Sequence, residues 1–227
     1  MSDIPHIPAD VVERLNSQSE DALKRLNQII NDDKWQNSKK TTEEIQFFYR
    51  TMDDSPYGMI KSIVKIPAPL DACLAVLDPI TTIDDNTPEA ERRSFTYRNV
   101  ISFNPDEETK PMLFYCACPS PSFMVSPREF YLYRRHYVQD GKHIYLHITP
   151  QGECPGISST VRKGYVRGNM HLQGFIAEPE GDQISLTYFV YFDPCGSIPA
   201  MVYNMAVENQ GYTAKGTKKR VLANLQK

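Results

Sequence analysis

The segment Ser126–Arg135 alternates cationic and apolar side chains, a pattern that can bring charge into an apolar environment. In an extended strand, side chains two residues apart share a face, so one face carries Arg128, Phe130, Leu132 and Arg134. If that face lines a cavity, Arg134 requires an anionic or strongly hydrogen-bonding partner, because an unpaired buried charge is costly. The partner is a protein carboxylate or a ligand head group. The alternative is a shifted register that leaves both arginines in solvent.

Motifs of hydrolytic, metal and nucleotide chemistry are missing from the sequence. The chain has no GxSxG elbow, no HExxH pair and no Walker loop. His143 and His147 are four residues apart, which in a strand separates them by about 13 Å, too far for one metal ion. The five cysteines form no CxxC pair, and their odd number favours reduced thiols in an intracellular protein. We therefore predict no catalytic residue, no metal and no cofactor.

Composition limits the classes of protein further. The 227 residues are 41% hydrophobic and 23% charged, which is typical of a globular domain. The net charge of −3 gives no general attraction to nucleic acid. We find neither an apolar run of the ~18–20 residues that a membrane span needs nor a secretory signal. We expect a monomeric, cytoplasmic protein that does not bind nucleic acid.

Strands must position most of these side chains, since segments rich in Tyr, Phe, Val, Ile and Thr dominate after the first thirty residues. Turn pairs such as Asp140-Gly141 indicate hairpins, and hairpins favour an antiparallel sheet. The expected strands are 34–39, 44–51, 58–66, 93–103, 111–118, 128–138, 142–149, 163–177 and 182–192.

Helical spacing is expected in three places. The first thirty residues are helical, with a predicted break at 16–19 where Ser19 would cap a second segment. A short helix is expected at 69–78. A long helix begins near Pro199 and runs to about Leu225, and its first half is apolar nearly all round, which is typical of a buried helix. Five of its residues fall on one stripe, namely Ile198, Val202, Met205, Asn209 and Tyr212.

Together these elements predict an α+β protein with a single domain over residues 8–225. Its curved antiparallel sheet of about nine strands would wrap around the long C-terminal helix. A twisted sheet with a helix across its concave side need not close fully. The space between helix and sheet is a natural place for an apolar cavity, which Val202 and Met205 are expected to line.

Three segments resemble motifs of START (StAR-related lipid transfer) domains. They are Ser126–Arg135, the run from Val166-Arg167-Gly168 to Gly174-Phe175, and the Asp193-Pro194 turn that leads to Ile198-Pro199. The order of elements is also similar, over about residues 8 to 225. The resemblance implies a helix-grip fold whose internal hydrophobic tunnel binds a single lipid, such as a phospholipid or sterol, and transfers it between membranes without catalysis. Such a cavity removes the cost of exposing lipid chains to water, ~0.8 kcal/mol per CH₂.

The resemblance also implies lipid-binding residues. In the phosphatidylcholine-binding type an aromatic cage holds the quaternary ammonium, and its positions correspond to Tyr115, Phe130 and His171. The arginine and aspartate that hold the phosphate in that type fall in the segment 78–86, which contains no arginine. This departure argues against phosphocholine as the head group.

Two further types of START domain add candidates. The sterol-binding type pairs the position of Arg134 with an acid on the preceding strand, but the segment 112–118 contains no acid. Arg134 is therefore predicted to be free to bind a ligand phosphate or carboxylate. The ceramide-binding type has a tyrosine at the position of Tyr188, which is expected to be a hydroxyl of the tunnel or, alternatively, to lie at the rim of a packed core.

The loop before residue 126 ends in apolar residues, and in START domains the corresponding loop covers the tunnel mouth. We expect Phe123 and Met124 to form a lid that makes transient contact with a membrane surface; alternatively they fold inward as a plug. Two other function classes stay open: an enzyme on the same cavity with His147 and His171 as acid and base, and a ligand-gated lipid sensor or adaptor.

Overall fold

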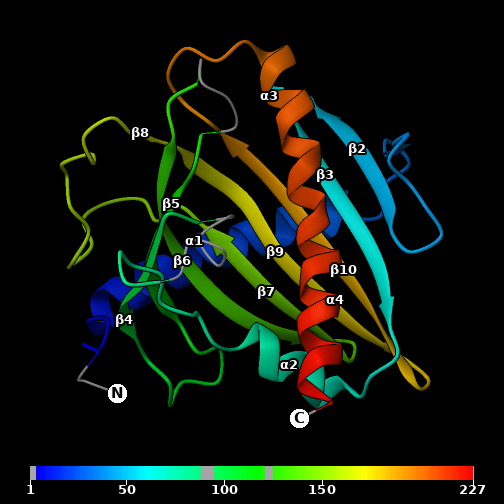
Figure 1. Cartoon of the computed structure of the whole chain (residues 1–227). Coiled ribbons are helices and arrows are strands. Elements are labelled where there is room, and N and C mark those ends of the chain that lie inside the picture. The colour runs from blue at the N-terminus through cyan, green and yellow to red at the C-terminus, as the bar shows by residue number, and fades with distance from the viewer. Residues whose placement is uncertain (1–3, 88–94, 121–124, 227) are drawn as a thin grey trace.

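The computed structural model describes residues 4–87, 95–120 and 125–226, and Figure 1 shows their arrangement. The helices are α1 (Ala9–Ile29), α2 (Leu70–Leu77), α3 (Ala200–Val207) and α4 (Tyr212–Asn224), with a 3-10 turn at Glu208–Gly211 between the last two. The strands are β1 (Gln36–Asn37), β2 (Gln46–Met52), β3 (Ser55–Ile66), β4 (Tyr97–Phe103), β5 (Met112–Cys118), β6 (Arg128–Gln139), β7 (Lys142–Ile148), β8 (Val166–Arg167), β9 (Asn169–Glu180) and β10 (Gln183–Asp193).

The strands form one sheet in the order β1-β2-β3-β10-β9-β7-β6-β5-β4. Neighbours along this path are antiparallel, as the hairpin turns predict. The short strand β8 lies off the path and pairs in parallel with the start of β6. The path begins at β1 and ends at β4, so the sheet is not closed into a barrel. The expected antiparallel sheet with a C-terminal helix across it is confirmed.

Two separate cores cover the two faces of the sheet. In Figure 1 the C-terminal helices and α2 lie in front of the sheet, and α1 lies behind it. We call the face toward α2, α3 and α4 the inner face, and the face toward α1 the outer face. The inner core includes Phe47, Val64, Phe114, Leu132 and Leu186, and the outer core includes Leu15, Leu26, Leu146, Leu172 and Phe189.

The predicted break at 16–19 is absent, because α1 runs without interruption from Ala9 to Ile29. The polar residues that suggested a break instead face tyrosines of the sheet. Tyr133 donates to Asn16 Oδ1 at 2.7 Å, and Tyr137 donates to Ser19 Oγ at 2.7 Å. Ser19 is fully buried. Asn16 and Ser19 could end a helix that is exposed to solvent, but here they accept hydrogen bonds from tyrosines of the outer face.

The predicted strand 163–177 is divided at Gly168 into β8 and β9. The backbone N–H of Gly168 donates to the carbonyl of Glu129 at 3.0 Å. A Cβ at Gly168 would overlap the ring of Phe130, so glycine allows the chain to pass close to β6 before it turns into β9. Strand propensity alone does not show this change of partner.

The terminal helix differs from its prediction in two respects. A 3-10 turn separates α3 from α4, and α3 is not buried all round, since Met201 is 72% exposed. The predicted stripe is also rotated, because Tyr212 is 47% exposed. The buried side has large residues toward both ends and small residues between them, which allow the helix to approach the sheet. The buried side consists of Tyr203, Val207, Gly211, Ala214, Thr217 and Val221.

We expect Gly211→Ala to lower the free energy of unfolding by about 1–3 kcal/mol through overpacking. A Cβ at Gly211 would overlap the ring of Phe47, which is only 1% exposed and has little room to move. Urea denaturation measures the change. As the matched control, Gly216→Ala in α4 adds a Cβ to open space and should raise the free energy of unfolding by about 0.5–1 kcal/mol. Equal effects at the two positions would contradict the close contact.

Candidate functional site

Arg134 of β6 lies on the inner face with only 2% of its surface exposed. Its Nη1 donates to the backbone oxygen of Asp78 at 2.7 Å, and its Nη2 lies 3.8 Å from Asp78 Oδ1. The guanidinium carbon is 4.8 Å from the centre of the Tyr145 ring. Phe130 and Leu132 belong to the inner core, so the predicted alternation along β6 is correct and Arg134 is a cation in apolar surroundings.

Asp78 supplies the internal carboxylate that the sequence did not reveal. It is the C-cap of α2, and its Oδ1 accepts a hydrogen bond from Tyr145 at 2.7 Å. Lys110 Nζ lies 3.3 Å from its Oδ2. The prediction that Arg134 is free to bind a ligand anion is therefore wrong, because its partner comes from α2 rather than from the preceding strand.

The pKa directions around Asp78 reflect a balance of burial and charge. Burial by itself would raise the pKa of Asp78, but the Tyr145 hydrogen bond and the charges of Lys110 and Arg134 outweigh it and hold the pKa below its usual value. Burial lowers the pKa of Arg134 in spite of the nearby carboxylate. A guanidinium nevertheless stays charged in proteins, so the pair consists of a cation and an anion.

A row of polar side chains continues from Arg134 across three more strands. Arg134 is opposite His147 of β7, and His147 is opposite Gln173 of β9. The atoms His147 Nδ1 and Gln173 Oε1 are 2.6 Å apart, and Gln173 Nε2 donates to the Tyr188 hydroxyl of β10 at 3.4 Å. An amide oxygen only accepts, so His147 carries its hydrogen on Nδ1 and keeps a lone pair on Nε2. We call these four residues the polar row.

Burial keeps most of the polar row uncharged. Burial, followed by the charge of Arg134, lowers the pKa of His147 to about 3. Burial also raises the pKa of Tyr188 to about 12. Among the described residues, Arg134 Nε is a buried atom with no hydrogen-bond partner. The row therefore offers neutral donors and acceptors, next to one cation that Asp78 compensates.

Apolar side chains surround the polar row on the inner face. His147 packs edge-on against Phe114 with ring centres 5.4 Å apart, and the rings of Phe175 and Tyr188 are 5.2 Å apart. The inner core around them includes Met112, Cys116, Leu132, Ala177 and Val190. An apolar surface crossed by a few convergent polar groups is the usual character of a site for an amphipathic small molecule.

The three expected cage residues do not come together. Phe130 lies on the inner face and packs against Phe192 with ring centres 5.5 Å apart. Tyr115 lies on the outer face, where its hydroxyl donates to Glu129 at 3.0 Å. His171 stacks on the outer-core residue Tyr191, 4.6 Å between ring centres. The motif positions are therefore present, but the strand registers place Tyr115 and His171 away from Phe130.

The remaining predicted positions lie in α3, in the loop before β6 and in β10. Val202 is half-buried in α3, whereas the side chain of Met205 lies outside the described part of the structure. Phe123 and Met124 also lie outside the described residues, so their role as a lid stays a prediction. Tyr188 is 2% exposed and belongs to the polar row. Its hydroxyl therefore lies in the interior, and its role as a hydroxyl of a lipid tunnel stays a prediction.

Arg128 has a positioning role that its pattern did not indicate. Its Nε donates to the backbone oxygen of Pro194 at 2.6 Å, and its Nη2 donates to that of Cys195 at 3.0 Å. Its Nη1 donates to the backbone oxygen of Ser126. One buried guanidinium therefore joins the start of β6 to the turn before α3. Because all three acceptors are backbone atoms, no sequence motif could have identified them.

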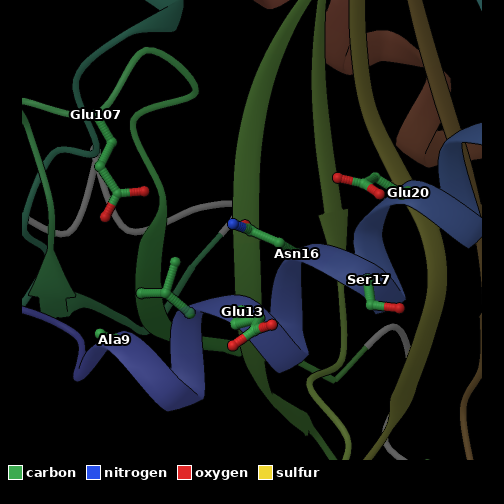
Figure 2. A pocket seen from close by; sticks show the side chains of 7 residues that line it. Ala9, Glu13, Asn16, Ser17, Glu20 and Glu107 are labelled. Atoms are coloured by element: carbon green, nitrogen blue, oxygen red, sulfur yellow. The ribbon is translucent and has the colours of Figure 1, made fainter.

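Two hollows in the described surface lie outside the inner face. One, of about 430 Å³, runs along α1, and Figure 2 shows Glu13, Glu20 and Glu107 around it. The other, of about 470 Å³, lies against β4, β5 and β6. Neither hollow is under the C-terminal helix, so a lipid tunnel at that place stays a prediction.

We expect Asp78→Asn to destabilise the protein more than Arg134→Met does. The first change leaves the nearly inaccessible Arg134 cation without its carboxylate, whereas Asp78, with a side chain 38% exposed, can be hydrated when Arg134 is lost. Asp78→Asn should cost about 2–4 kcal/mol of unfolding free energy in guanidinium chloride titrations. The double variant should be more stable than Asp78→Asn alone. A larger loss from Arg134→Met would contradict this assignment of the buried charge.

The unfolding free energy should also fall as the pH is lowered from about 6.5, the pKa of an unfolded histidine. Folded His147 has a pKa of about 3, so between these values the unfolded state binds a proton that the folded state does not. The slope from this residue is about 1.4 kcal/mol per pH unit at most. Denaturation between pH ~6.5 and ~5 should give a smaller slope for His147→Gln, while the exposed control His6→Gln keeps the wild-type slope. Equal slopes for wild type and His147→Gln would refute the expectation.

In the part of the chain that the structure describes, the helices are too short or too polar to cross a bilayer. A comparison with curated protein sequences finds no match. Among solved structures, the chain is similar to the human StAR-related lipid transfer protein 5, with 16% identity over 95% of this chain and 100% of that chain and a TM-score of 0.74.

Two other solved structures are similar. A fragment of a STAR-related lipid transfer protein from Xanthomonas axonopodis is 22% identical, covering 86% of this chain and 100% of that chain with a TM-score of 0.62. Human STARD10 is 16% identical, and the match covers 89% of this chain and 79% of that chain with a TM-score of 0.66. These likenesses show the fold. The family model of the START domain matches residues 114–227, half of the sequence, and the chain belongs to the START domain family.

Proposed function

We propose that this protein binds a single lipid between the inner face and helices α3 and α4, and transfers it between membranes without covalent chemistry. The START fold supports lipid binding and transfer in general. The observation that carries the proposal for this chain is the polar row within the apolar inner face. Apolar side chains suit the body of a lipid, and the row suits its polar end.

The chemistry of the row favours a lipid whose polar end is an uncharged hydroxyl over one with a phosphate. Asp78 already compensates the charge of Arg134, and burial keeps His147 neutral by lowering its pKa to about 3. A hydroxyl could donate to His147 Nε2 and accept from Arg134 Nε, which has no described partner. A phosphate would lie near the Asp78 carboxylate and would be opposed by its charge.

The same geometry supports transfer rather than catalysis. The acid–base pair considered from the sequence, His147 and His171, does not share a face: His147 packs on Phe114 of the inner core, and His171 stacks on Tyr191 of the outer core. Two groups on opposite faces of a sheet cannot act on one bound molecule. Contact with a membrane surface through a lid of Phe123 and Met124 belongs to this proposal, as do a cytoplasmic location and a monomeric state.

The test is lipid transfer from donor to acceptor vesicles, with cholesterol as the hydroxyl lipid and phosphatidylcholine as the phosphate lipid. Gln173→Leu breaks the polar row between His147 and Tyr188 without a change of charge. Because Gln173 Oε1 holds the hydrogen of His147 on Nδ1, its loss would no longer keep the Nε2 lone pair available to the lipid hydroxyl. We expect the cholesterol transfer rate to fall about tenfold, the size of one lost buried hydrogen bond. Native mass spectrometry of the purified protein should show one bound lipid per chain.

Gln46→Leu provides the control, because it makes the same substitution at an exposed position of the strand β2. It should transfer cholesterol at the wild-type rate. Unfolding midpoints of both variants separate loss of binding from loss of folding. If the wild type binds neither lipid, lipid carriage is refuted. If it transfers phosphatidylcholine and not cholesterol, the hydroxyl specificity is refuted.

A further inference from the structure

The hollow of about 470 Å³ lies on the outer face, on the opposite side of the sheet from the polar row. Its floor consists of tyrosines from three adjacent strands: Tyr97 of β4, Tyr115 of β5 and Tyr131 of β6. The segment 158–163, between β7 and β8, forms its wall. The rings of Tyr115 and Tyr131 are 5.0 Å apart and tilted. The hollow is thus lined by aromatic rings and by a mostly polar segment of the chain, in which Val161 is the aliphatic residue.

The buried carboxylate of Glu129 binds the segment 158–163 to the sheet. It is 1% exposed, and its Oε2 accepts hydrogen bonds from the Arg162 backbone N–H and the Tyr115 hydroxyl, each at 3.0 Å. Its Oε1 accepts from Arg167 Nε at 3.0 Å and from Arg167 Nη2 at 2.6 Å. Both carboxylate oxygens are therefore used, and Arg167 compensates the charge. Glu129 orders the hollow but leaves no negative charge available to a ligand.

The guanidinium of Arg162 stacks on two tyrosine rings and donates no hydrogen bond to a described residue. Its guanidinium carbon is 4.5 Å from the ring centre of Tyr97 and 5.5 Å from that of Tyr165. A turn stabilises the position, since Tyr165 N–H donates to the Arg162 carbonyl at 2.9 Å and Gly164 has a φ of +84°. No acceptor among the described residues takes a hydrogen bond from the Arg162 side chain. Aromatic rings occupy the flat face of the guanidinium, and its N–H edge stays available for a carboxylate or phosphate.

Two more donors line the same hollow. Lys163 at the tip of the turn is exposed, and Asn99 of β4 is half-buried. Neither side chain forms a hydrogen bond or ion pair with another described residue. The hollow therefore combines two cations, a carboxamide and three tyrosine rings. Two adjacent cations match the two charges of a phosphate monoester better than the single charge of a carboxylate.

We infer that this hollow binds a phosphate monoester carried on a cyclic polyol, with the phosphate at Arg162 and Lys163 and the ring against the tyrosine floor. A volume of about 470 Å³ is within the range of small-molecule sites, about 300–1,000 Å³, and has room for more than a lone phosphate. The phosphate could belong to a lipid head group in a membrane or to a free polyol phosphate. Binding at this hollow does not require lipid carriage at the inner face.

The probes are vesicles of phosphatidylcholine that contain phosphatidylinositol monophosphate, matched vesicles that contain phosphatidylinositol, and soluble inositol bisphosphate. We expect the wild type to bind the phosphorylated probes and to bind phosphatidylinositol vesicles at least about tenfold more weakly. Arg162→Gln should lower the affinity for the phosphorylated probes about tenfold, the loss of one charge-assisted contact. Arg162→Lys should lower it too, because it keeps the charge but loses the fork and the stacking on Tyr97.

Lys39→Gln is the matched control. It removes one exposed positive charge between β1 and β2, at the opposite end of the sheet from β4, so it changes net charge equally without touching the hollow. Wild-type affinity in Lys39→Gln together with a loss in Arg162→Gln supports the site. Equal losses in both variants, unchanged affinity in Arg162→Gln, or no binding of any phosphorylated probe would overturn it.

The soluble probe distinguishes the two sources of the phosphate. Binding of inositol bisphosphate that prevents vesicle binding indicates that the phosphorylated ring alone is recognised. Vesicle binding that the soluble probe does not prevent, and that Arg162→Gln weakens, assigns the site to a membrane lipid. Lipid transfer by Arg162→Gln, measured with cholesterol, should equal that of the wild type when the acceptor vesicles contain no phosphoinositide, so failure of lipid carriage and failure of this site give different results.

Discussion

The buried charge of Arg134 constrains the whole inner side of the protein. A guanidinium that is 2% exposed is tolerated only with a nearby carboxylate, and Asp78 provides it from the end of α2. The pairing therefore fixes the C-terminus of α2 against β6, and Tyr145 of β7 completes it with a hydrogen bond to the same carboxylate. Because Asp78 balances the cation, the interior can be apolar around a row of uncharged polar groups.

The two faces of the sheet differ in chemistry because successive side chains of a strand point to opposite faces. Alternate residues of β6 contribute to opposite faces: Phe130 and Leu132 to the inner core, Tyr131 and Glu129 to the outer hollow. Helix α1 covers only part of the outer face, as Figure 1 shows. The part over β4, β5 and the start of β6 is lined instead by the segment 158–163, and this is where exposed cations lie against tyrosine rings.

The two sites also differ in how they treat arginine. On the inner face, Arg128 and Arg134 donate to backbone carbonyls or to a nearby carboxylate, and their charges hold the fold together. On the outer face, Arg167 is paired with Glu129 in the same way, whereas Arg162 is oriented by aromatic stacking and donates to no described acceptor. Residue type alone does not separate these roles; the available partners do.

By itself the sequence determined the features that depend on local periodicity. The two-residue alternation of β6, the hairpins of the antiparallel sheet, the positions of most strands and the START motifs follow from residues close together in the chain. The same locality explains the errors. Asn16 to Ser19 resembled a helix end because their sheet partners, more than a hundred residues away, were not visible.

Only the tertiary structure decided which side chains meet. Asp78 and Arg134 are 56 positions apart, so no spacing rule could pair them. The strand registers placed Tyr115 and His171 away from Phe130, although a motif suggested one cage. The terminal helix lies close to the sheet at Gly211, where a Cβ would overlap the ring of Phe47. Helical periodicity weighs only the apolar side chains that are present, so it gave no sign of this close approach.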